Sequence, residues 1–295
     1  MNKLLNQPKK LFCVDKQTHT AKQLPWRLPH YFMLELTAQC NFNCPYCYCL
    51  WHEFPLLSNK PLSTGEWQNI IAFLSKKKVD SLLFTGGEVL LRKDIKEIVS
   101  FARAQLPQGN LSLFTNSSLL TEDLFHFFKS LEIKLFTSLQ GLETYSDMTG
   151  YRCSAEHLLA NVRYAKNNAW PMAVSITVTR KNKYEICNMF AAAAEAGACT
   201  IQVGAMMPQG RGKQHLELTL SRNEWECIKN QIRNMPNCGV PYTFCDEMIC
   251  ECRKHSKEIF NRFHNPDKTI CRAGKDYGVI SPNGIYRKCL HFYEE

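Results

Sequence analysis

The feature that most constrains the fold is a sixfold alternation of short apolar runs with helical patterns. The runs are rich in Leu, Val, Ile and Phe, which is typical of strands buried in a parallel sheet. They cover residues 31–37, 80–85, 110–115, 133–138, 172–179 and 200–205. Strand–helix–strand units are right-handed and make parallel sheets. Six units are fewer than the eight of a complete barrel. The pattern therefore predicts an α/β chain with an open or partial barrel or a doubly wound sheet, and reactive groups at the carboxyl ends of its strands.

Capping signals indicate where several of the helices begin and end. Ser63 with Glu66, and Ser221 with Glu224, form capping boxes ahead of two helices. Gly197 follows another helical pattern as a C-terminal cap. The predicted helices run from Ser63 to Lys76, over 93–105, 121–131, 155–167 and 183–196, and from Ser221 to about Asn234.

The composition narrows the class of protein. Of 295 residues, 45% are apolar and 21% are charged, which excludes a disordered chain. The net charge of +9 is spread along the chain, which favours a solvated surface over a nucleic-acid-binding face. Neither a membrane-spanning run nor a signal-peptide core occurs, so we expect a cytoplasmic protein with no membrane partner.

The strand–helix rhythm stops near Asn234, and Cys, Pro and Gly then become frequent. We therefore predict an entry segment over 1–30, a partial barrel over 31–235 and a small Cys-rich extension over 236–295. The chain has 15 cysteines. In a long chain without an export signal, this number indicates metal or redox chemistry and not a disulfide framework.

Three cysteines follow the first strand directly, as Cys40, Cys44 and Cys47 in a CxxxCxxC pattern. A four-iron cluster held by three thiolates keeps one iron open, as catalysis requires. A structural zinc site needs four ligands, and Cys49 or His52 could supply the fourth. The cysteines could also be free, buried thiols.

A glycine-rich turn ends the second strand, with Gly86, Gly87 and Glu88. Two glycines let a ligand approach the backbone closely, and a carboxylate beside them suits an ammonium group. An ordinary strand–helix turn is the alternative reading.

Together, in this order and on successive strand ends, the two motifs resemble those of the radical S-adenosylmethionine (SAM) superfamily over about residues 31–235. The resemblance implies the partial barrel of that family. It also implies a [4Fe–4S] cluster on Cys40, Cys44 and Cys47, with SAM on the fourth iron. The turn at 86–88 would bind the methionine amine, and Tyr46 would pack at the cluster and adenine.

Later strand ends resemble further segments of the SAM site. The resemblance makes Asn116 and Ser138 candidates for the SAM pocket, together with Gly204, in a segment over 203–212 that resembles one near the adenine. Thr177 is a further candidate, because it ends the fifth strand and would line the same cavity. Gln140 stands where the family usually has Asp, which removes a charge from that position.

The implied reaction begins when a reduced cluster passes one electron into SAM. This yields methionine and a 5′-deoxyadenosyl radical that abstracts hydrogen from a substrate. An electron donor such as flavodoxin or ferredoxin is an expected partner.

The end of the chain resembles the opening of SPASM or twitch extensions. Cys271, Gly284 and Cys289 have the matching spacing, with a hairpin turn over 280–284. Such extensions bind auxiliary [4Fe–4S] clusters. The sequence stops six residues after Cys289, so we expect a shortened or degenerate extension.

Ligands for a possible auxiliary [4Fe–4S] cluster would come from Cys245, Cys250, Cys252, Cys271 and Cys289. Packing of these cysteines as small hydrophobic residues is the alternative.

Three functions follow from these observations. The first is a radical SAM enzyme that matures a ribosomally made peptide or protein by cross-linking, epimerisation or oxidation. A separate leader-binding protein would present its substrate, because no long N-terminal domain precedes the barrel. The second is a radical SAM enzyme for a small molecule, by sugar dehydrogenation or tetrapyrrole modification. The third is a non-catalytic iron–sulfur or zinc module.

Overall fold

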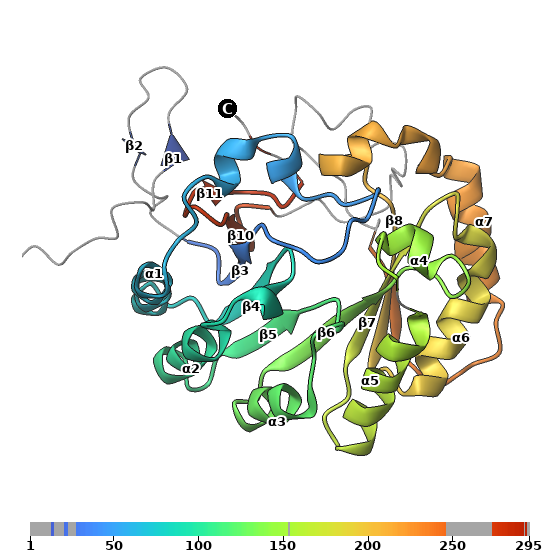
Figure 1. Ribbon diagram of the computed structural model, residues 1–295, viewed down its shortest axis with the longest axis horizontal. Coiled ribbons are helices and arrows are strands. Elements are labelled where there is room, and N and C mark those ends of the chain that lie inside the picture. The colour runs from blue at the N-terminus through green and yellow to red at the C-terminus, as the bar shows by residue number, and fades with distance from the viewer. Residues whose placement is uncertain are drawn as a thin grey trace, which may run out of the picture.

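The computed structural model describes residues 28–152, 154–245, 273–291 and 293, and the backbone of two short strands, β1 (Cys13–Val14) and β2 (Ala21–Lys22). Six parallel strands, adjacent in chain order, form the centre of one large sheet (Figure 1). This arrangement confirms the partial barrel that the sixfold pattern and the family resemblance predict. The strands are β3 (Tyr31–Thr37), β4 (Ser81–Gly86), β5 (Asn110–Phe114), β6 (Lys134–Leu139), β7 (Ala173–Val178) and β8 (Thr200–Ala205).

Six helices lie on the outer face of the curved sheet (Figure 1). Both predicted capping boxes are present, at Ser63 with Glu66 and at Ser221 with Glu224. The helices are α1 (Thr64–Lys76), α2 (Ile95–Gln105), α3 (Glu122–Ser130), α5 (Ala155–Asn167), α6 (Ile186–Ala196) and α7 (Arg222–Arg233).

The hydrophobic core lies between these helices and the sheet, in two main clusters. One joins α1, α2 and α3 to the strands β3 to β6 around Trp67 and Phe84. The other joins α5, α6 and α7 to β7 and β8 around Trp225 and Phe190. These four side chains are at most 2% exposed, and each such burial stabilises the fold by about 1.5–3 kcal/mol. The core therefore fixes the strand ends on which the site is built.

Three further strands extend the sheet at its two edges. β9 (Tyr242–Phe244) pairs parallel with β8, and β10 (Tyr277–Ile280) pairs parallel with β3. β11 (Tyr286–Arg287) pairs antiparallel with β10, which confirms the predicted hairpin turn. Strands from both sides of the predicted boundary after residue 235 thus share one sheet; the division into three domains stays a prediction.

Several one-turn elements have no counterpart among the predicted helices, because they are too short to show a period. They are α4 (Tyr145–Thr149), η1 (Leu50–His52), η2 (Pro55–Ser58), η3 (Val89–Leu91), η5 (Gly210–Gln214) and η6 (Leu216–Leu218). The predicted helix over 183–196 is formed by η4 (Lys183–Glu185) and then α6. None of the helices in the described part of the chain is long and apolar enough to span a membrane.

Candidate active site

A cavity of about 420 Å³ lies at the carboxyl ends of β3 to β7, where the fold predicts reactive groups. Its wall joins the loop after β3 to the ends of the next four strands. Most of the predicted cluster and SAM residues line it: Cys40, Cys44, Tyr46, Cys47, Gly86, Gly87, Asn116, Ser138 and Thr177. Glu88 and Gly204 are not part of this wall.

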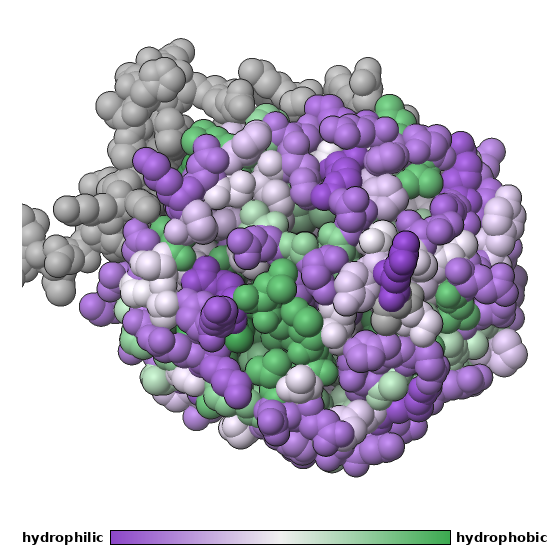
Figure 2. Space-filling model, viewed as in Figure 1, coloured by the Kyte–Doolittle hydropathy of each residue, from purple (hydrophilic) through white to green (hydrophobic). Residues whose placement is uncertain are grey.

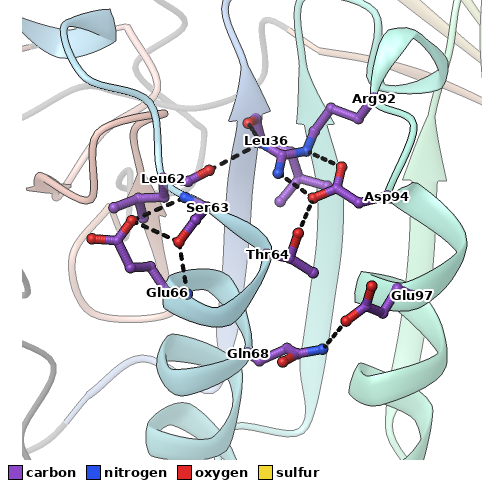
Figure 3. Close-up of polar contacts among 9 residues, drawn as sticks. All are labelled: Leu36, Leu62, Ser63, Thr64, Glu66, Gln68, Arg92, Asp94 and Glu97. Atoms are coloured by element: carbon purple, nitrogen blue, oxygen red, sulfur yellow. Dashed lines mark hydrogen bonds and ion pairs between the residues drawn. The ribbon is translucent and has the colours of Figure 1, made fainter.

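The loop from residue 38 to residue 62, which we call the cysteine loop, is held at both ends by one guanidinium group (Figure 3). Nη1 of Arg92 donates to the carbonyl oxygens of Leu36, at 2.9 Å, and Leu62, at 3.3 Å. Asp94 orients this side chain through bonds of 2.9 and 2.6 Å, and also accepts from Thr64 at 2.5 Å. Burial raises the pKa of Asp94, but its bonds to Arg92 and Thr64 outweigh that effect and lower it.

The glycine turn packs directly against the start of the cysteine loop. The backbone N–H groups of Gly87 and Glu88 donate to the carbonyls of Thr37 and Gln39, each at 2.7 Å. A Cβ at Gly87 would lie 2.1 Å from the Gln39 oxygen, and one at Gly86 would lie 2.3 Å from the Thr37 oxygen. Glycine is therefore required here for the close approach of two backbone segments.

The Glu88 carboxylate lies behind the cavity wall and is fully buried. It accepts hydrogen bonds from the backbone N–H of Leu90 at 2.9 Å, from Oγ1 of Thr115 at 2.7 Å and from the backbone N–H of Asn116 at 2.7 Å. Burial raises its pKa, and these bonds oppose the rise. The carboxylate thus ties the end of β4 to the end of β5; the predicted direct contact with a methionine amine stays a prediction.

The three thiols of the CxxxCxxC motif are not in disulfides. Burial raises the pKa of Cys44 to about 12 and also raises that of Cys40. Hydrogen bonds from Cys49 and His52 outweigh burial at Cys47 and hold its pKa well below the ordinary value. The three thiols therefore differ in how readily each forms the thiolate, which is the form that binds metal.

The described residues contain no compact set of side chains that could bind a single metal ion. Among the described residues, no three His, Cys, Asp or Glu side chains gather closely enough for a single metal ion. Three soft thiol donors around a cavity fit a cofactor of several atoms, as an iron–sulfur cluster is.

Two buried polar atoms on the cavity wall have no hydrogen-bond partner within the described chain: Nε1 of Trp51 and Oε1 of Gln140. Buried polar atoms are nearly always paired, so unpaired ones that share a cavity indicate a polar ligand. The residues present thus fit a thiolate-bound cluster beside a polar molecule such as SAM.

The segment after β8 closes over the cysteine loop from the other side. Gly210 has φ +58°, and a Cβ there would lie 2.7 Å from the Cys47 carbonyl oxygen. The N–H of Gly212 donates to that same oxygen at 3.2 Å. Arg211, between them, enters the cavity wall and donates to the Cys44 carbonyl at 3.1 Å.

The remaining predicted residues occupy different settings. Asn116 donates to the side chain of Asn41 at 2.9 Å, and Ser138 accepts from Gln140. Gly204 lies on β8 beside Cys245, whose Cβ would be 3.3 Å from a Cβ added to the glycine. Gly204 therefore borders the end of β9, and its role in the SAM pocket stays a prediction.

Sequence reasoning did not name Asn41, Trp51 or Ser175, which also line the cavity. Ser175 could have been found, because it lies two residues before Thr177 and strand residues of one parity share a face. Asn41 and Trp51 lie in the cysteine loop, where no period indicates which side chains face inward. The segment over 203–212, which resembles a family segment near the adenine, brings Arg211 into the wall.

The proposed auxiliary ligands are only partly within the described residues. Cys245 follows β9 and Cys289 follows β11, at opposite ends of the strand order. Cys250, Cys252 and Cys271 lie outside the described residues. The auxiliary cluster stays a prediction.

Comparisons with known proteins identify the family of the chain. The model of the radical SAM superfamily matches residues 34–192. An AdoMet-dependent heme synthase from Methanosarcina barkeri is 30% identical over 276 residues, covering 88% of this chain and 76% of the relative. A PqqA peptide cyclase from Bradyrhizobium diazoefficiens is 24% identical, covering 94% and 70%. The sporulation killing factor maturation protein SkfB from Bacillus subtilis is 25% identical, covering 75% and 53%.

Among solved structures, SuiB from Streptococcus suis bound to the precursor peptide SuiA shares the fold, with a TM-score of 0.70 and 16% identity. The match covers 90% of this chain and 60% of SuiB, so the chain spans well under two thirds of that protein. The family match and the heme synthase together confirm the resemblance that the cysteine and glycine motifs predict. The chain belongs to the radical SAM superfamily.

Proposed function

We propose that this chain binds a [4Fe–4S] cluster through Cys40, Cys44 and Cys47, binds SAM beside it, and abstracts hydrogen from a peptide or protein substrate. The observation that carries the proposal is that these three cysteines share one cavity with Gly86 and Gly87 in a chain of the radical SAM superfamily. When bound, cluster and SAM together supply a one-electron reductive cleavage whose carbon radical removes a hydrogen atom from substrate.

The protein's part in this reaction is positioning and the exclusion of water. Gly86, Gly87 and Asn116 would hold SAM along the ends of β4 and β5, together with Ser138 on β6 and Tyr46 of the cysteine loop. Glu88 would act from behind the wall, because its carboxylate fixes the backbone of Asn116.

The polar groups of the cavity wall at the ends of β6 and β7 favour a substrate that is recognised through neutral groups. Gln140, Ser175 and Thr177 lie there, and in the described chain the hydroxyls of Ser175 and Thr177 make no hydrogen bond with the protein. Hydroxyl and amide groups suit the N–H and C=O of a peptide. Figure 2 shows that hydrophobic residues gather in the middle of the face where Figure 1 places β5 and β6. An apolar side chain of a peptide could rest on this area.

The named activities of several relatives support the same substrate class. They include a maturation protein and PqqA peptide cyclases, and a solved SuiB structure holds its precursor peptide. The reaction would be a cross-link, an epimerisation or an oxidation. A separate leader-binding protein and a flavodoxin or ferredoxin are proposed partners, in the cytoplasm.

Modification of a tetrapyrrole is a second candidate, with its own observation. The heme synthase of Methanosarcina barkeri is 30% identical, and an Fe-coproporphyrin III synthase of the same organism is 24% identical. Propionate groups of a tetrapyrrole would need cations. Apart from His52, Arg211 is the basic side chain in the cavity wall, as far as the structure describes it.

The first test is formation of 5′-deoxyadenosine from SAM by anaerobically reconstituted, dithionite-reduced protein. We expect product from the wild type and none from the triple Cys40→Ala, Cys44→Ala, Cys47→Ala variant, which should also lose its iron. A matched variant that removes three exposed thiols, Cys199→Ala, Cys227→Ala, Cys238→Ala, should keep both. A wild type that holds iron and sulfide but never cleaves SAM would favour the non-catalytic module.

A second experiment separates the two substrate classes. Synthetic peptides that tile any short open reading frame beside the gene are incubated with enzyme and SAM, and their masses are measured. Fe-coproporphyrin III is tested in parallel by absorption titration and product mass. We expect a mass change in a peptide and no saturable binding of the porphyrin. The reverse result would replace the peptide proposal with the tetrapyrrole one.

A further inference from the structure

The hairpin formed by β10 and β11 contacts the cysteine loop along much of its length. Its strand β10 lies in register on β3, the strand that leads into the loop. The carbonyl of Pro282, at the hairpin turn, accepts from the N–H of Leu62 at 2.8 Å. Nδ2 of Asn283 donates to the carbonyl of Leu56 at 2.7 Å. The hairpin therefore holds the far end of the loop as well as the strand before it.

The residues after the hairpin cover the middle of the same loop. The ring of His291 lies edge-on to Tyr48, with centroids 5.0 Å apart. The ring of Tyr293 lies edge-on to Phe54 at 5.4 Å. Within the hairpin itself, Ile285 packs on the apolar group of Cys49, Leu50, Trp51 and Leu57. Nothing in the proposed function uses these contacts.

A fully buried ion pair joins the hairpin to β3, the strand before the cysteine loop. Nη2 of Arg287 donates to the carboxylate of Glu35, and the two side chains are 1% and 2% exposed. Nη1 of Arg287 also donates to the carbonyl of Leu290 at 3.1 Å. A buried ion pair contributes little net stability compared with an apolar pair of the same volume. Stability alone therefore does not account for these two charges.

The pair lies close to the middle of the cysteine loop, because Arg287 holds the carbonyl of Leu290 and the next residue, His291, packs on Tyr48, the neighbour of Cys47. Burial raises the pKa of Glu35, Arg287 lowers it, and the nearby thiol of Cys47 raises it again. A charge that acts on the Cys47 sulfur also acts on any cluster that this sulfur binds.

We propose that Glu35 and Arg287 are positioning residues that set the reduction potential of the cluster, so that the carboxyl-terminal hairpin is a working part of the SAM site. This inference rests on the proposed function, because it needs a cluster on Cys47. Nearby charge and hydrogen bonding are among the features by which proteins tune iron–sulfur potentials. The hairpin thus acts on the SAM cluster whether or not the extension also holds an auxiliary cluster.

The test is the midpoint potential of the reconstituted cluster, measured by a redox titration followed by electron paramagnetic resonance. Glu35→Gln removes a negative charge and leaves Arg287, so we expect the potential to rise. Arg287→Gln leaves the carboxylate unbalanced, so we expect it to fall. Arg287→Lys keeps the charge and should return the potential to near the wild-type value. Lys288→Gln, at the exposed neighbouring position, is the matched control and should change nothing.

Iron content and melting temperature are measured on every variant, so that a folding defect is recognised. If Arg287→Gln fails to fold, Glu35→Gln and the neutral double variant Glu35→Gln, Arg287→Gln give the comparison with the wild type. Potentials equal to the wild type in folded, iron-loaded charge variants would overturn this inference alone. A wild type that never holds the cluster would overturn the proposed function and this inference with it.

Discussion

The partial barrel has a first half, β3 to β5, and a second half, from β6 onward, and the two line the cavity in different ways. At the ends of β3, β4 and β5, backbone and side chains are tied together by the Arg92, Glu88 and Asn116 bonds, and the glycine turn leaves no space between segments. At the ends of β6 and β7, the wall has an unpaired amide oxygen on Gln140 and the unbonded hydroxyl of Ser175, within the described chain.

This difference matches two tasks. A loop that binds a cluster must keep its ligands fixed, and the polar groups of the first half bond mostly to one another, although Nε1 of Trp51 has no partner in the described chain. If the second half recognises substrate, as proposed, the oxygen of Gln140 and the hydroxyl of Ser175 are available for it. Both halves have their own hydrophobic core, which lets one be rigid while the other stays open to ligands. Mutations should therefore affect cluster binding in the first half and substrate turnover in the second.

The largest effect is expected at the glycine turn. In Gly87→Ala the new methyl group would meet the Gln39 carbonyl at 2.1 Å, so the cysteine loop must move. We expect at least half of the iron to be lost on reconstitution, together with SAM cleavage. Gly65→Ala is the control, because a Cβ there has no neighbour within 4 Å and alanine favours the helix. Full iron content in Gly87→Ala would show that the close packing is not needed.

The next effect is expected at the guanidinium that holds both ends of the cysteine loop. Arg92→Gln removes its bonds to Leu36, Leu62 and Asp94, which should lower the free energy of unfolding by about 2–3 kcal/mol. Chemical denaturation measures this change, and iron content should fall with it. Arg163→Gln breaks an exposed pair with Glu156 and should cost less than about 1 kcal/mol. Equal losses in the two variants would contradict the special role of Arg92.

A smaller and different effect is expected in the second half. Ser175→Ala removes a hydroxyl that bonds to nothing in the described chain, so stability should change by less than about 0.5 kcal/mol and iron content should stay the same. If this hydroxyl contacts substrate, product formation should fall up to about tenfold. Product mass and melting temperature, measured side by side, check the prediction. Unchanged product formation would remove Ser175 from the substrate wall.

The smallest effect concerns acid stability at α7. A hydrogen bond from Lys183, with others from Ser221 and Arg180, lowers the pKa of Glu224 below its ordinary value. A folded-state pKa below the unfolded one gives stability that is present above about pH 4.5 and is lost as the pH falls. Melting temperatures between pH 3 and pH 7 should therefore fall less steeply for Glu224→Gln than for the wild type. Parallel curves would contradict the assignment.

The sequence predicted the sheet more completely than the site. The bounds of β3 and β8, and those of α1 and α5, agree with the predicted ones, because a buried strand and an amphipathic helix each have a period that short segments reveal. The helix α4 was not predicted, since its five residues are too few to show one.

Candidate residues within a motif were found, whereas those brought in from a distance were not. Cys40, Cys44 and Cys47 identify themselves by spacing, and they line the cavity. Ser175 reaches the same cavity from β7, and no motif near it in the sequence indicates this. Glu88 was also found through its motif. Only the packing of the folded chain decides that its carboxylate lies behind the cavity wall.

By itself, the sequence determined the strand–helix order, the motif that makes the chain a radical SAM protein and the hairpin turn near its end, because each depends on residues close together in the chain. Only the tertiary structure decided that the hairpin lies on β3, that Arg287 meets Glu35, and that one guanidinium holds both ends of the cysteine loop. These contacts join residues up to 252 positions apart, and they form only when the whole sheet and its core are in place.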